Sequence, residues 1–313
     1  MKCTIQNIAD HLGLSRNTVS KALKNSSEVS ENTRNLVIKT ASKLGYKNAT
    51  FATPVIPASE TGSNGTILFL TRTYASDSEF WTTVLRGIES ILSNANYHLA
   101  ISIMSDSDLK QLNFPQTISD SSIKGIILVE ICDKVVCDAL SQFNLPIVSV
   151  DMPNVPFEEL NGIDVVTMES KKNLKKIINQ LIEKGAESFG FVGDLYSPNV
   201  SRGFQERYNA LSECLAEHQL PLNQKNCLLH QTPEDFRNFQ TTVNNLQAMI
   251  SLPDVFICGN DWTAIQLIYA LQFLGFQIPK DICVVGFDNI PAASRISPSL
   301  TTISTPQKYL GIA

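Results

Sequence analysis

The sequence predicts an all-α domain at the amino terminus followed by an α/β body of two lobes, and three observations support this fold class. The first 46 residues contain three amphipathic helical patterns. From residue 66 onward, short apolar runs alternate with longer amphipathic segments, which is the pattern of parallel sheets covered by helices. Residues 47–65 are rich in Ala, Thr, Pro, Ser and Gly. We therefore predict domains at residues 1–46 and 66–313, joined by a linker at residues 47–65.

The composition is that of an ordinary globular protein. Of the 313 residues, 43% are hydrophobic and 18% are charged, which excludes a disordered, collagen-like or coiled-coil chain. The longest apolar runs fall short of the roughly 18 to 20 residues that a membrane helix needs, and no secretion signal is seen at the amino terminus. The seven cysteines are scattered without a C-x-x-C pair, and the four histidines lie at no ligand spacing. We expect a cytoplasmic protein with no metal site and no cofactor.

The net charge of −5 is unevenly distributed along the chain. Residues 1–50 hold eight Lys or Arg and three acidic residues, a net charge of +5. The other 263 residues hold 17 basic and 27 acidic residues, a net charge of −10. A phosphate backbone attracts the first part and repels the second, so we expect the amino-terminal part to meet DNA. The alternative is a basic surface that is exposed to water and does not contact DNA, because it would carry the same charge.

Three short helices are predicted in this amino-terminal part, which we call the head. Thr4, Ser15 and Ser30 are the expected N-caps, and Gly13 and Gly45 end the first and third helices. The inward positions are Ile5, Ile8, Ala9 and Leu12 in the first helix, Val19, Ala22 and Leu23 in the second, and Val37, Ala41 and Leu44 in the third.

The first two helices form a helix-turn-helix, which places the start of its second helix at base edges in the major groove. Arg16 and Asn17 occupy those places. Arg pairs with guanine and Asn with adenine, each contact giving about 1 to 3 kcal/mol of discrimination. The predicted phosphate contacts are Ser15, Thr18, Ser20, Lys21, Lys24, Ser30 and Thr33. On pattern alone, a three-helix scaffold or a protein-docking module remains an alternative.

Several segments of the head closely resemble the LacI/GalR family of transcriptional repressors. They are Thr4-Ile-Gln-Asn-Ile-Ala9, Gly13-Leu-Ser-Arg-Asn-Thr-Val-Ser20, Val29-Ser30, Thr33-Arg34 and Leu44-Gly-Tyr46. The resemblance implies a homodimer that places two heads on a palindromic operator, and Thr4 and Tyr46 complete the expected DNA contacts. Two positions depart from the family: Asn7 stands where Asp is frequent, and Glu28 is an unusual neighbour for phosphate.

The linker departs further from the family. Relatives commonly fold this region into a hinge helix on the operator, with an Arg and an apolar wedge in the minor groove. Ala52 fits that pattern and Val55 is near the wedge position, but Thr53 stands where the Arg would be and Pro54 interrupts the helix. Because Pro in a helix interior costs about 3 kcal/mol or more, we expect the helix to begin later or not to form, which leaves binding to the heads.

The body is predicted to contain alternating strands and helices. The expected strands are residues 66–71, 97–103, 125–131, 146–150, 188–192, 254–258 and 281–285. The expected helices are residues 79–94, 134–143, 171–185, 205–218, 235–250 and 261–275. In such sheets ligands bind beyond the carboxyl ends of the strands, so residues that follow strands are candidates for a site.

Five residues of the body are candidate ligand contacts. Arg207 opens a predicted helix, Asp261 follows a predicted strand, Phe80 and Trp81 begin the first helix of the body, and Tyr74 precedes it. Arg and Asp make paired hydrogen bonds to vicinal hydroxyls, and aromatic faces cover the apolar side of a sugar ring. Each residue taken alone also has a purely structural interpretation. Arg207 could lie on a helix surface, Asp261 could cap a helix, and the aromatic residues could belong to the core.

Later segments extend the resemblance from Thr4 to the end of the sequence. Arg207-x-x-Ala210 is similar to the family's R-x-x-G segment, with Ala in place of Gly; the other matching segments are Asn260-Asp261-x-x-Ala264, Val285-Gly-Phe-Asp288 and Pro298-x-Leu-Thr-Thr302. Phe80 and Trp81 fall where the family places ring-stacking residues. The resemblance implies a type I periplasmic-binding-protein-like core whose two lobes close on a small ligand, and a subunit interface that reports closure to the heads. The family continues past Gly311 through a helix and a last strand; a naturally shorter protein would lack one connection between the lobes.

We therefore expect a DNA-binding transcriptional regulator of a metabolic operon, most simply a repressor, controlled by a sugar or similar effector. The sequence is compatible with an inducer that releases the protein from DNA and with a corepressor that tightens its binding to DNA. A solute-binding module without specific DNA binding is the alternative from another class. We expect no enzyme, because the sequence contains no G-x-G-x-x-G, P-loop, H-E-x-x-H or G-x-S-x-G segment.

Overall fold

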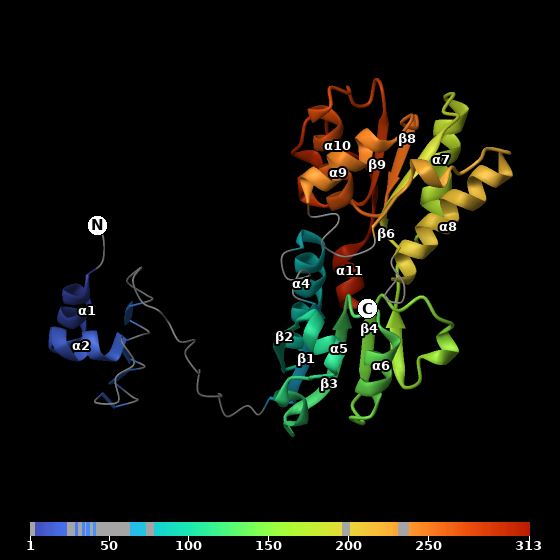
Figure 1. Cartoon of the computed structure of the whole chain (residues 1–313). Helices are drawn as coiled ribbons and strands as arrows, with labels where there is room; N and C mark the ends of the chain where they lie inside the picture. Colours follow the sequence, from blue (N-terminus) through green and yellow to red (C-terminus); the bar gives the residue numbers. More distant parts are fainter. Residues whose placement is uncertain are drawn as a thin grey trace. The chain divides into compact units, whose positions relative to one another are not determined.

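The computed structural model divides the chain into two compact units, residues 1–62 and 63–313 (Figure 1). It describes residues 4–23, 29, 30, 33, 34, 36, 37, 40, 41, 63–72, 78–195, 201–230 and 238–313. The linker residues 47–62, including Pro54, lie outside this range, so the expectation about the hinge helix stays a prediction. No helix in the described ranges is long and apolar enough to cross a membrane.

The first helix of the head, α1 (Ile5–Leu12), has the predicted caps. The Thr4 hydroxyl accepts from the Asn7 N–H at 3.3 Å, and Asn7 Oδ1 accepts from the Thr4 N–H at 2.9 Å. This reciprocal pair is a capping box, so Asn7 fills a structural role at a position where the related family often has Asp. Gly13 ends the helix with φ of 64°, a conformation that favours glycine.

The second helix, α2 (Arg16–Leu23), begins at Ser15, whose hydroxyl accepts from the Thr18 N–H at 3.0 Å. Ser30 accepts in the same way from the Thr33 N–H at 3.3 Å, before a third helical segment. The fully or almost fully buried residues that join these segments are Ile8, Ala9, Val19, Ala22, Val37 and Ala41. The three predicted helix starts and the predicted apolar stripes are therefore confirmed for the described residues.

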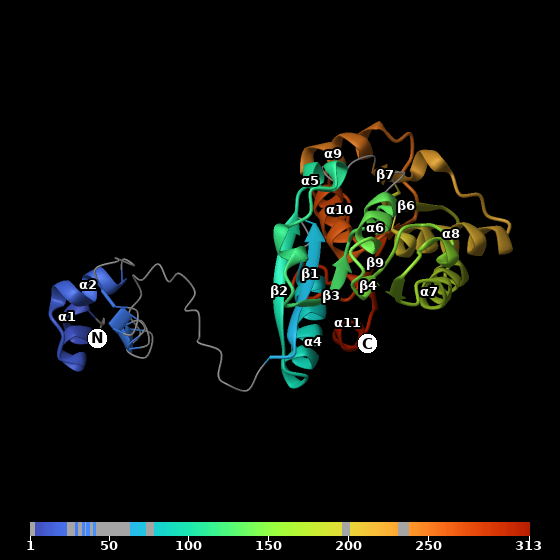
Figure 2. The same ribbon diagram turned by 90° about the horizontal axis from the view of Figure 1, so that it is seen from below.

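The body consists of two lobes, each built on a five-stranded parallel sheet. Lobe 1 has the strand order β2-β1-β3-β4-β5. Its elements are β1 (Gly65–Arg72), α4 (Glu79–Asn94), β2 (Tyr97–Met104), α5 (Asp106–Gln111), β3 (Ile123–Val129), α6 (Lys134–Ser141), β4 (Ile147–Val150) and β5 (Ile163–Val166), with 3-10 turns η2 (Gln116–Ser119) and η3 (Phe157–Glu159). Neighbouring residues of β1 face opposite sides: Leu68 and Leu70 pack in the cluster that includes α5 and α6, and Phe69 packs with α4. Figure 2 shows these helices on the two faces of the sheet.

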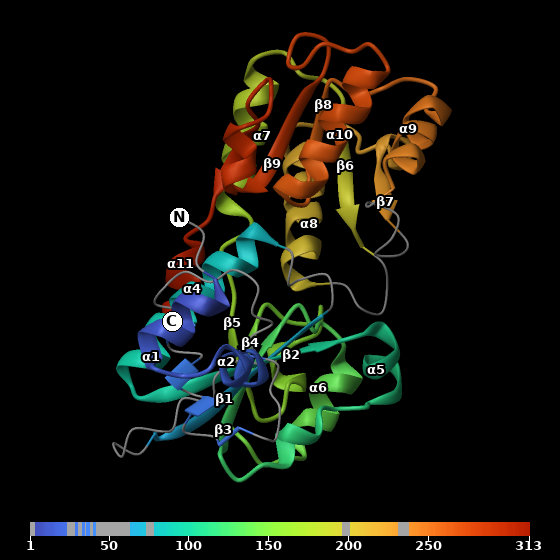
Figure 3. The ribbon, with the colours of Figure 1, turned by 90° about the vertical axis from the view of Figure 1, so that its left-hand side faces the viewer.

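Lobe 2 has the strand order β10-β9-β8-β6-β7. Its elements are α7 (Lys172–Glu183), β6 (Phe189–Asp194), α8 (Arg202–Glu217), β7 (Leu228–His230), α9 (Phe239–Ala248), β8 (Val255–Cys258), α10 (Asp261–Phe273), β9 (Cys283–Asp288) and β10 (Thr301–Ser304), with 3-10 turns η4 (Gln224–Asn226) and η5 (Pro291–Ser294). Phe191 packs with α7 and α8, and its neighbour Val192 packs with α9 and α10. Both sheets are thus covered on two faces, as the alternation of strands and helices predicted (Figure 3).

Two segments connect the lobes. Residues 167–171 lead from β5 to α7, and residues 305–306 lead from β10 back to α11 (Gln307–Ile312), which lies against α4 of lobe 1 (Figure 1). The two helices approach closely at Gly87 and Gly311, where an added methyl group would collide with the backbone of the other helix. Small residues at these positions therefore allow α11 to pack directly on lobe 1.

The predicted elements of the body are confirmed, with differences at their ends and at the sheet edges. The predicted strand at 125–131 lies at 123–129, and the helix predicted at 235–250 is described from residue 239 to 248. Arg207 does not open its helix: α8 begins five residues earlier, at Arg202, because Ser201 caps it and Gly203 is helical despite its low propensity. Strands β5, β7 and β10 were not predicted. All three are edge strands of three or four residues, which carry a weak apolar pattern because one side is open.

Candidate functional site

The head presents the two predicted base-reading side chains at the start of α2. Arg16 and Asn17 are exposed, and they follow the N-cap Ser15 directly. Val19 and Ala22 of the same helix are buried, so the helix is anchored by one face and open on the other. This arrangement suits a helix that inserts its amino-terminal side chains into a groove.

The other predicted DNA contacts of the head are placed as follows. Thr4, Ser15 and Ser30 are exposed, and Thr18, Ser20, Lys21 and Thr33 are half-buried. The hydroxyls of Ser15 and Thr18 lie 2.8 Å apart, as do those of Ser30 and Thr33. Lys24 and Tyr46 lie outside the described residues. Arg34 turns inward, where its Nη2 donates to the Val29 carbonyl at 3.1 Å.

In the body, the carboxyl ends of strands from both sheets border a cavity of about 380 Å³. The strand-end residues that line it are Arg72, Glu130, Cys132, Asp151, Val166, Asp194 and Asp288. The lining residues at helix starts are Ser78, Phe80 and Trp81 of α4, Ser201 to Phe204 of α8, and Asn260 and Trp262 of α10. The cavity therefore lies where parallel α/β sheets bind ligands, and it is shared by the two lobes.

Arg207 lines the cavity from α8 and is 4% exposed. Its Nη1 donates to the Gly259 carbonyl at 2.6 Å, and its guanidinium carbon lies 3.8 Å from the centroid of the Phe287 ring. Burial lowers the pKa of Arg207, and the nearby Asp288 and Asp151 carboxylates oppose this shift. A guanidinium fixed by a carbonyl and an aromatic face is prepared to bind a polar ligand group with little loss of side-chain entropy.

Three acidic residues at strand ends line the same cavity. Glu130 follows β3, Asp151 follows β4 and Asp288 ends β9, with positive φ angles of 56°, 68° and 116°. Such backbone conformations cost free energy in residues other than glycine, and they persist where the surrounding structure holds them. Burial raises the pKa of all three carboxyls, that of Glu130 to about 7 and that of Asp288 to about 8.

The Glu130 carboxylate is held by an aromatic residue that the sequence singled out. Trp81 Nε1 donates a hydrogen bond to Glu130 Oε1, and the Trp81 ring meets that of Phe80 edge to face with centroids 4.7 Å apart. Phe80 and Trp81 are largely buried but still line the cavity. The second oxygen of Glu130, Oε2, is buried without a hydrogen-bond partner among the described residues, and the same is true of Asp288 Oδ1.

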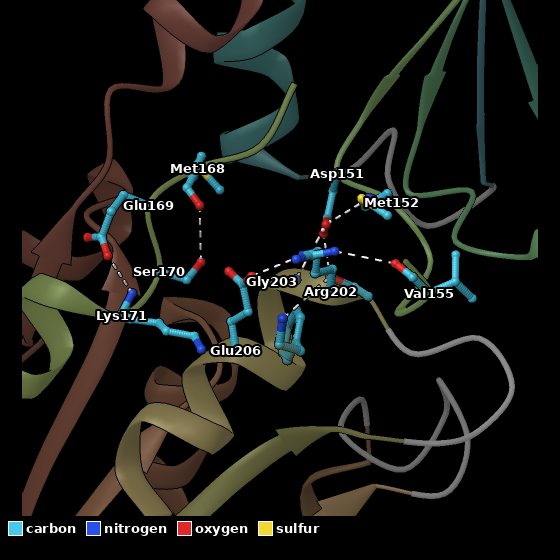
Figure 4. Close-up of polar contacts among 12 residues, drawn as sticks. Asp151, Met152, Val155, Met168, Glu169, Ser170, Lys171, Arg202, Gly203 and Glu206 are labelled. Atoms are coloured by element: carbon cyan, nitrogen blue, oxygen red, sulfur yellow. Dashed lines mark hydrogen bonds and ion pairs between the residues drawn. The ribbon is translucent and has the colours of Figure 1, made fainter. Parts of the chain in front are cut away.

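Asp151 connects lobe 1 to the start of α8 in lobe 2. Its carboxylate accepts hydrogen bonds from the Ser201 hydroxyl and, at 3.4 Å, from the Gly203 N–H (Figure 4). Arg202 reaches back, and its Nη1 donates to the Val155 carbonyl at 3.3 Å (Figure 4). A carboxylate of one lobe thus caps a helix of the other, which favours the negative charge at the helix amino terminus.

The structure separates the five predicted ligand contacts of the body. Phe80, Trp81 and Arg207 line the cavity, and Tyr74 lies outside the described residues. Asp261 is fully buried and does not line the cavity. Its carboxylate accepts from the Thr302 hydroxyl at 2.5 Å and from the Ile290 N–H at 2.8 Å, so it joins the start of α10 to the loops around β9 and β10.

Sequence reasoning missed most of the charged lining. The missed residues are Arg72, Glu130, Asp151, Asp194, Arg202, Glu206 and Asp288. The rule that ligands bind beyond strand ends applies to most of them: Glu130 and Asp151 each follow an apolar run directly, and Asp288 ends the Val-Gly-Phe-Asp segment. Within the described parts of the chain, no three His, Cys, Asp or Glu side chains are grouped so as to hold a metal ion.

Two family models match this chain. The model of bacterial regulatory proteins of the lacI family matches residues 4–48, and the model of periplasmic binding protein-like domains matches residues 178–313. Residues 4–48 therefore form a DNA-binding domain of the lacI type, and residues 178–313 belong to a periplasmic binding protein-like domain. The matched segments correspond to the helix-turn-helix head and to most of lobe 2 with α11.

Similar proteins can be aligned with almost the whole chain. Catabolite control protein A of Staphylococcus xylosus is 27% identical over 316 residues, covering 99% of this chain and 90% of that protein. The ribose operon repressor of Haemophilus influenzae is 27% identical, covering 98% of this chain and 88% of that protein. The transcriptional repressor PurR of Photobacterium profundum is 26% identical with the same coverage.

Solved structures of LacI-family regulators share the fold. The transcriptional regulator CelR in complex with cellobiose has a TM-score of 0.67 at 18% identity, covering 99% of this chain and 90% of that chain. The lac repressor dimer bound to operator and an anti-inducer has a TM-score of 0.64 at 20% identity, covering 100% of this chain and 90% of that chain. The predicted fold class, a helix-turn-helix head followed by a two-lobed periplasmic-binding-protein-like body, is confirmed.

Proposed function

We propose that this chain is a sequence-specific DNA-binding transcriptional regulator, a repressor of a metabolic operon, whose body binds a small effector. The observation that carries the proposal is the start of α2, where Arg16 and Asn17 are exposed directly after a capped helix start in a domain matched by the lacI model. The similar catabolite control, ribose and PurR proteins are regulators by name, and two of them are repressors.

We propose further that the chain acts as a homodimer on a palindromic operator. The similar lac repressor is a dimer bound to its operator, which supports this proposal. A bacterial regulator that binds DNA acts in the cytoplasm, so we propose that this protein is cytoplasmic. Regulation by binding DNA needs no catalytic step, so we propose that it is not an enzyme. The effector site is the cavity between the lobes, contacted by Phe80, Trp81 and Arg207 among the predicted residues. The domain boundaries that we propose are residues 1–46, 47–65 and 66–313.

Selection from a randomised duplex pool, followed by fluorescence anisotropy at several salt concentrations, tests this function. We expect a palindrome to be selected, and Arg16→Ala to relax specificity at one symmetric pair of positions. Arg295→Ala is the matched control: Arg295 is a body residue with a side chain 72% exposed, so the variant removes the same charge. Weak, strongly salt-dependent binding without sequence preference would contradict the proposal and favour a solute-binding module.

A further inference from the structure

The charged groups that line the cavity are unbalanced. Among the described lining residues, five are acidic and three are Arg. Two of the three Arg side chains already have carboxylate partners: Arg72 lies 2.6 Å from Asp106, which is outside the lining, and Arg202 lies 3.0 Å from Glu206. Arg207 is the third, and four carboxylates of the surroundings act on it.

Among the described lining residues, Glu130 and Asp288 are the carboxyls with a buried oxygen that lacks a hydrogen-bond partner, and they come from opposite lobes. Glu130 follows β3 of lobe 1, and Asp288 ends β9 of lobe 2. In each case this oxygen is buried, and Asp288 as a residue is only 8% exposed. A buried carboxylate without a partner is costly, so it gains free energy from a ligand group that donates hydrogen bonds and carries positive charge.

The negative charges also act on one another. Burial is the largest cause of the raised pKa of Asp288, and Asp261, Glu130 and Asp151 add to it while Arg207 opposes it. Burial also raises the pKa of Glu130, with Asp151 and Asp194 adding to the shift and Trp81 and Arg72 opposing it. Even with Arg72 and Arg207 nearby, the raised pKa values mean that one or both carboxyls hold a proton near neutral pH unless a further cation binds. A ligand with an ammonium group replaces that proton and leaves both carboxylates ionised, whereas a neutral polyol does not.

We propose that the effector of this cavity carries a protonated amine, and that its ammonium group lies between the carboxylates of Glu130 and Asp288. The inference rests on the proposed function, since it concerns the effector site of the regulator. A primary ammonium has three N–H donors and can serve an oxygen from each lobe at once. The aromatic side chains of Phe80 and Trp81 line the same cavity, and aromatic faces also attract cations. The chemical class is a small polar amine, such as an amino sugar, and the ammonium would hold the two lobes together.

Calorimetry on the full chain in phosphate buffer at pH 7.5 tests the proposal with matched pairs. The pairs are glucosamine with glucose, galactosamine with galactose, mannosamine with mannose, and Tris with pentaerythritol, in which a hydroxymethyl group replaces the ammonium. We expect at least one amine to bind at least tenfold more tightly than its neutral partner. We expect Glu130→Gln and Asp288→Asn to reduce that preference to less than threefold, because each removes one carboxylate and keeps the side-chain shape.

Glu183→Gln is the matched control, since it makes the same substitution at an exposed carboxylate of α7 that does not line the cavity. The preference for the amine should survive in this variant. Equal binding within every pair, or no binding of any amine up to 50 mM, overturns the inference. A neutral sugar that binds and changes operator affinity would overturn the inference and leave the proposed function standing. Failure of operator selection itself would instead contradict the proposed function.

Discussion

Lowering the pH from 8 to 6 should raise the free energy of unfolding of the body. A protein whose carboxylates are stabilised by ion pairs would not gain stability in this way, because its carboxyls have lowered pKa values. The buried carboxyl of Asp288 has a pKa of about 8 and that of Glu130 about 7, both far above the ordinary value near 4. Between pH 4 and the raised pKa values, the two carboxyls keep their protons in the folded state but have released them in the unfolded state. The free energy of unfolding therefore falls as the pH rises through this window, and it becomes level above about pH 8.

The magnitude follows from the number of protons involved. One group that is protonated in the folded state and ionised in the unfolded state changes the stability by about 1.4 kcal/mol per pH unit. From pH 6 to 8, Asp288 alone gives roughly 2 kcal/mol and Glu130 roughly 1.4 kcal/mol. Because the two carboxyls interact and share their protons, we expect a total of about 2 to 4 kcal/mol.

Urea unfolding followed by tryptophan fluorescence at pH 6, 7 and 8 measures this change. The two tryptophans of the chain, Trp81 and Trp262, both lie in the body, so the signal does not report on the head. The double variant Glu130→Gln with Asp288→Asn should lose most of the pH dependence and be more stable than the wild type at pH 8. A wild-type stability that is level or rises from pH 6 to 8, or an unchanged slope in the double variant, would refute the reasoning.

Three further changes have definite expected outcomes. Arg16→Ala should cost about 1 to 3 kcal/mol of discrimination at one base pair in each half-site, measured by competition between operator variants. Asp261→Ala should lower the urea stability of the body by about 2 to 4 kcal/mol, because it leaves the buried N–H of Ile290 and the Thr302 hydroxyl without their acceptor, and it should not change which ligand binds. Arg202→Ala should weaken ligand binding about 5- to 30-fold by loosening the contact between lobes, while Arg202→Lys should recover only part of it; unchanged affinity in Arg202→Ala would show that the contact has no part in closure.

The sequence predicted the central strands well and the sheet edges poorly. Strands such as β1, β3 and β8 are buried on both faces and appear as continuous apolar runs. By contrast β5 and β10 have no buried residue, so their sequences do not differ visibly from loops. The apolar pattern records burial, and an edge strand is fixed mainly by backbone hydrogen bonds to its neighbour, which any residue except Pro can make.

The site shows a second limit of sequence reasoning, which is the direction of a side chain at a strand end. Asn260 and Asp261 are adjacent, yet Asn260 lines the cavity while Asp261 bonds to Thr302 within lobe 2. Asp288, which ends the next strand, lines the cavity instead. All of these residues satisfy the rule that sites follow strands. Which of them faces the ligand depends on turns after the strand, such as the positive φ of Asp288, and these are set by packing that the local sequence does not reveal.

Helix α8 connects the ligand site to the contact between lobes. Its start is held by lobe 1, through Asp151 and through the bond from Arg202 to the Val155 carbonyl. Arg207 lines the cavity five residues later, which is about 8 Å along the helix axis, and Leu211 then anchors the helix in the core of lobe 2. A ligand that shifts the backbone of α8 at Arg207 would also shift the start of the helix, and with it the bonds to lobe 1. We therefore expect the bonds at the start of α8 to contribute to a coupling between ligand binding and the arrangement of the lobes, and a few such bonds are of the order of the 1 to 3 kcal/mol typical of allosteric regulation.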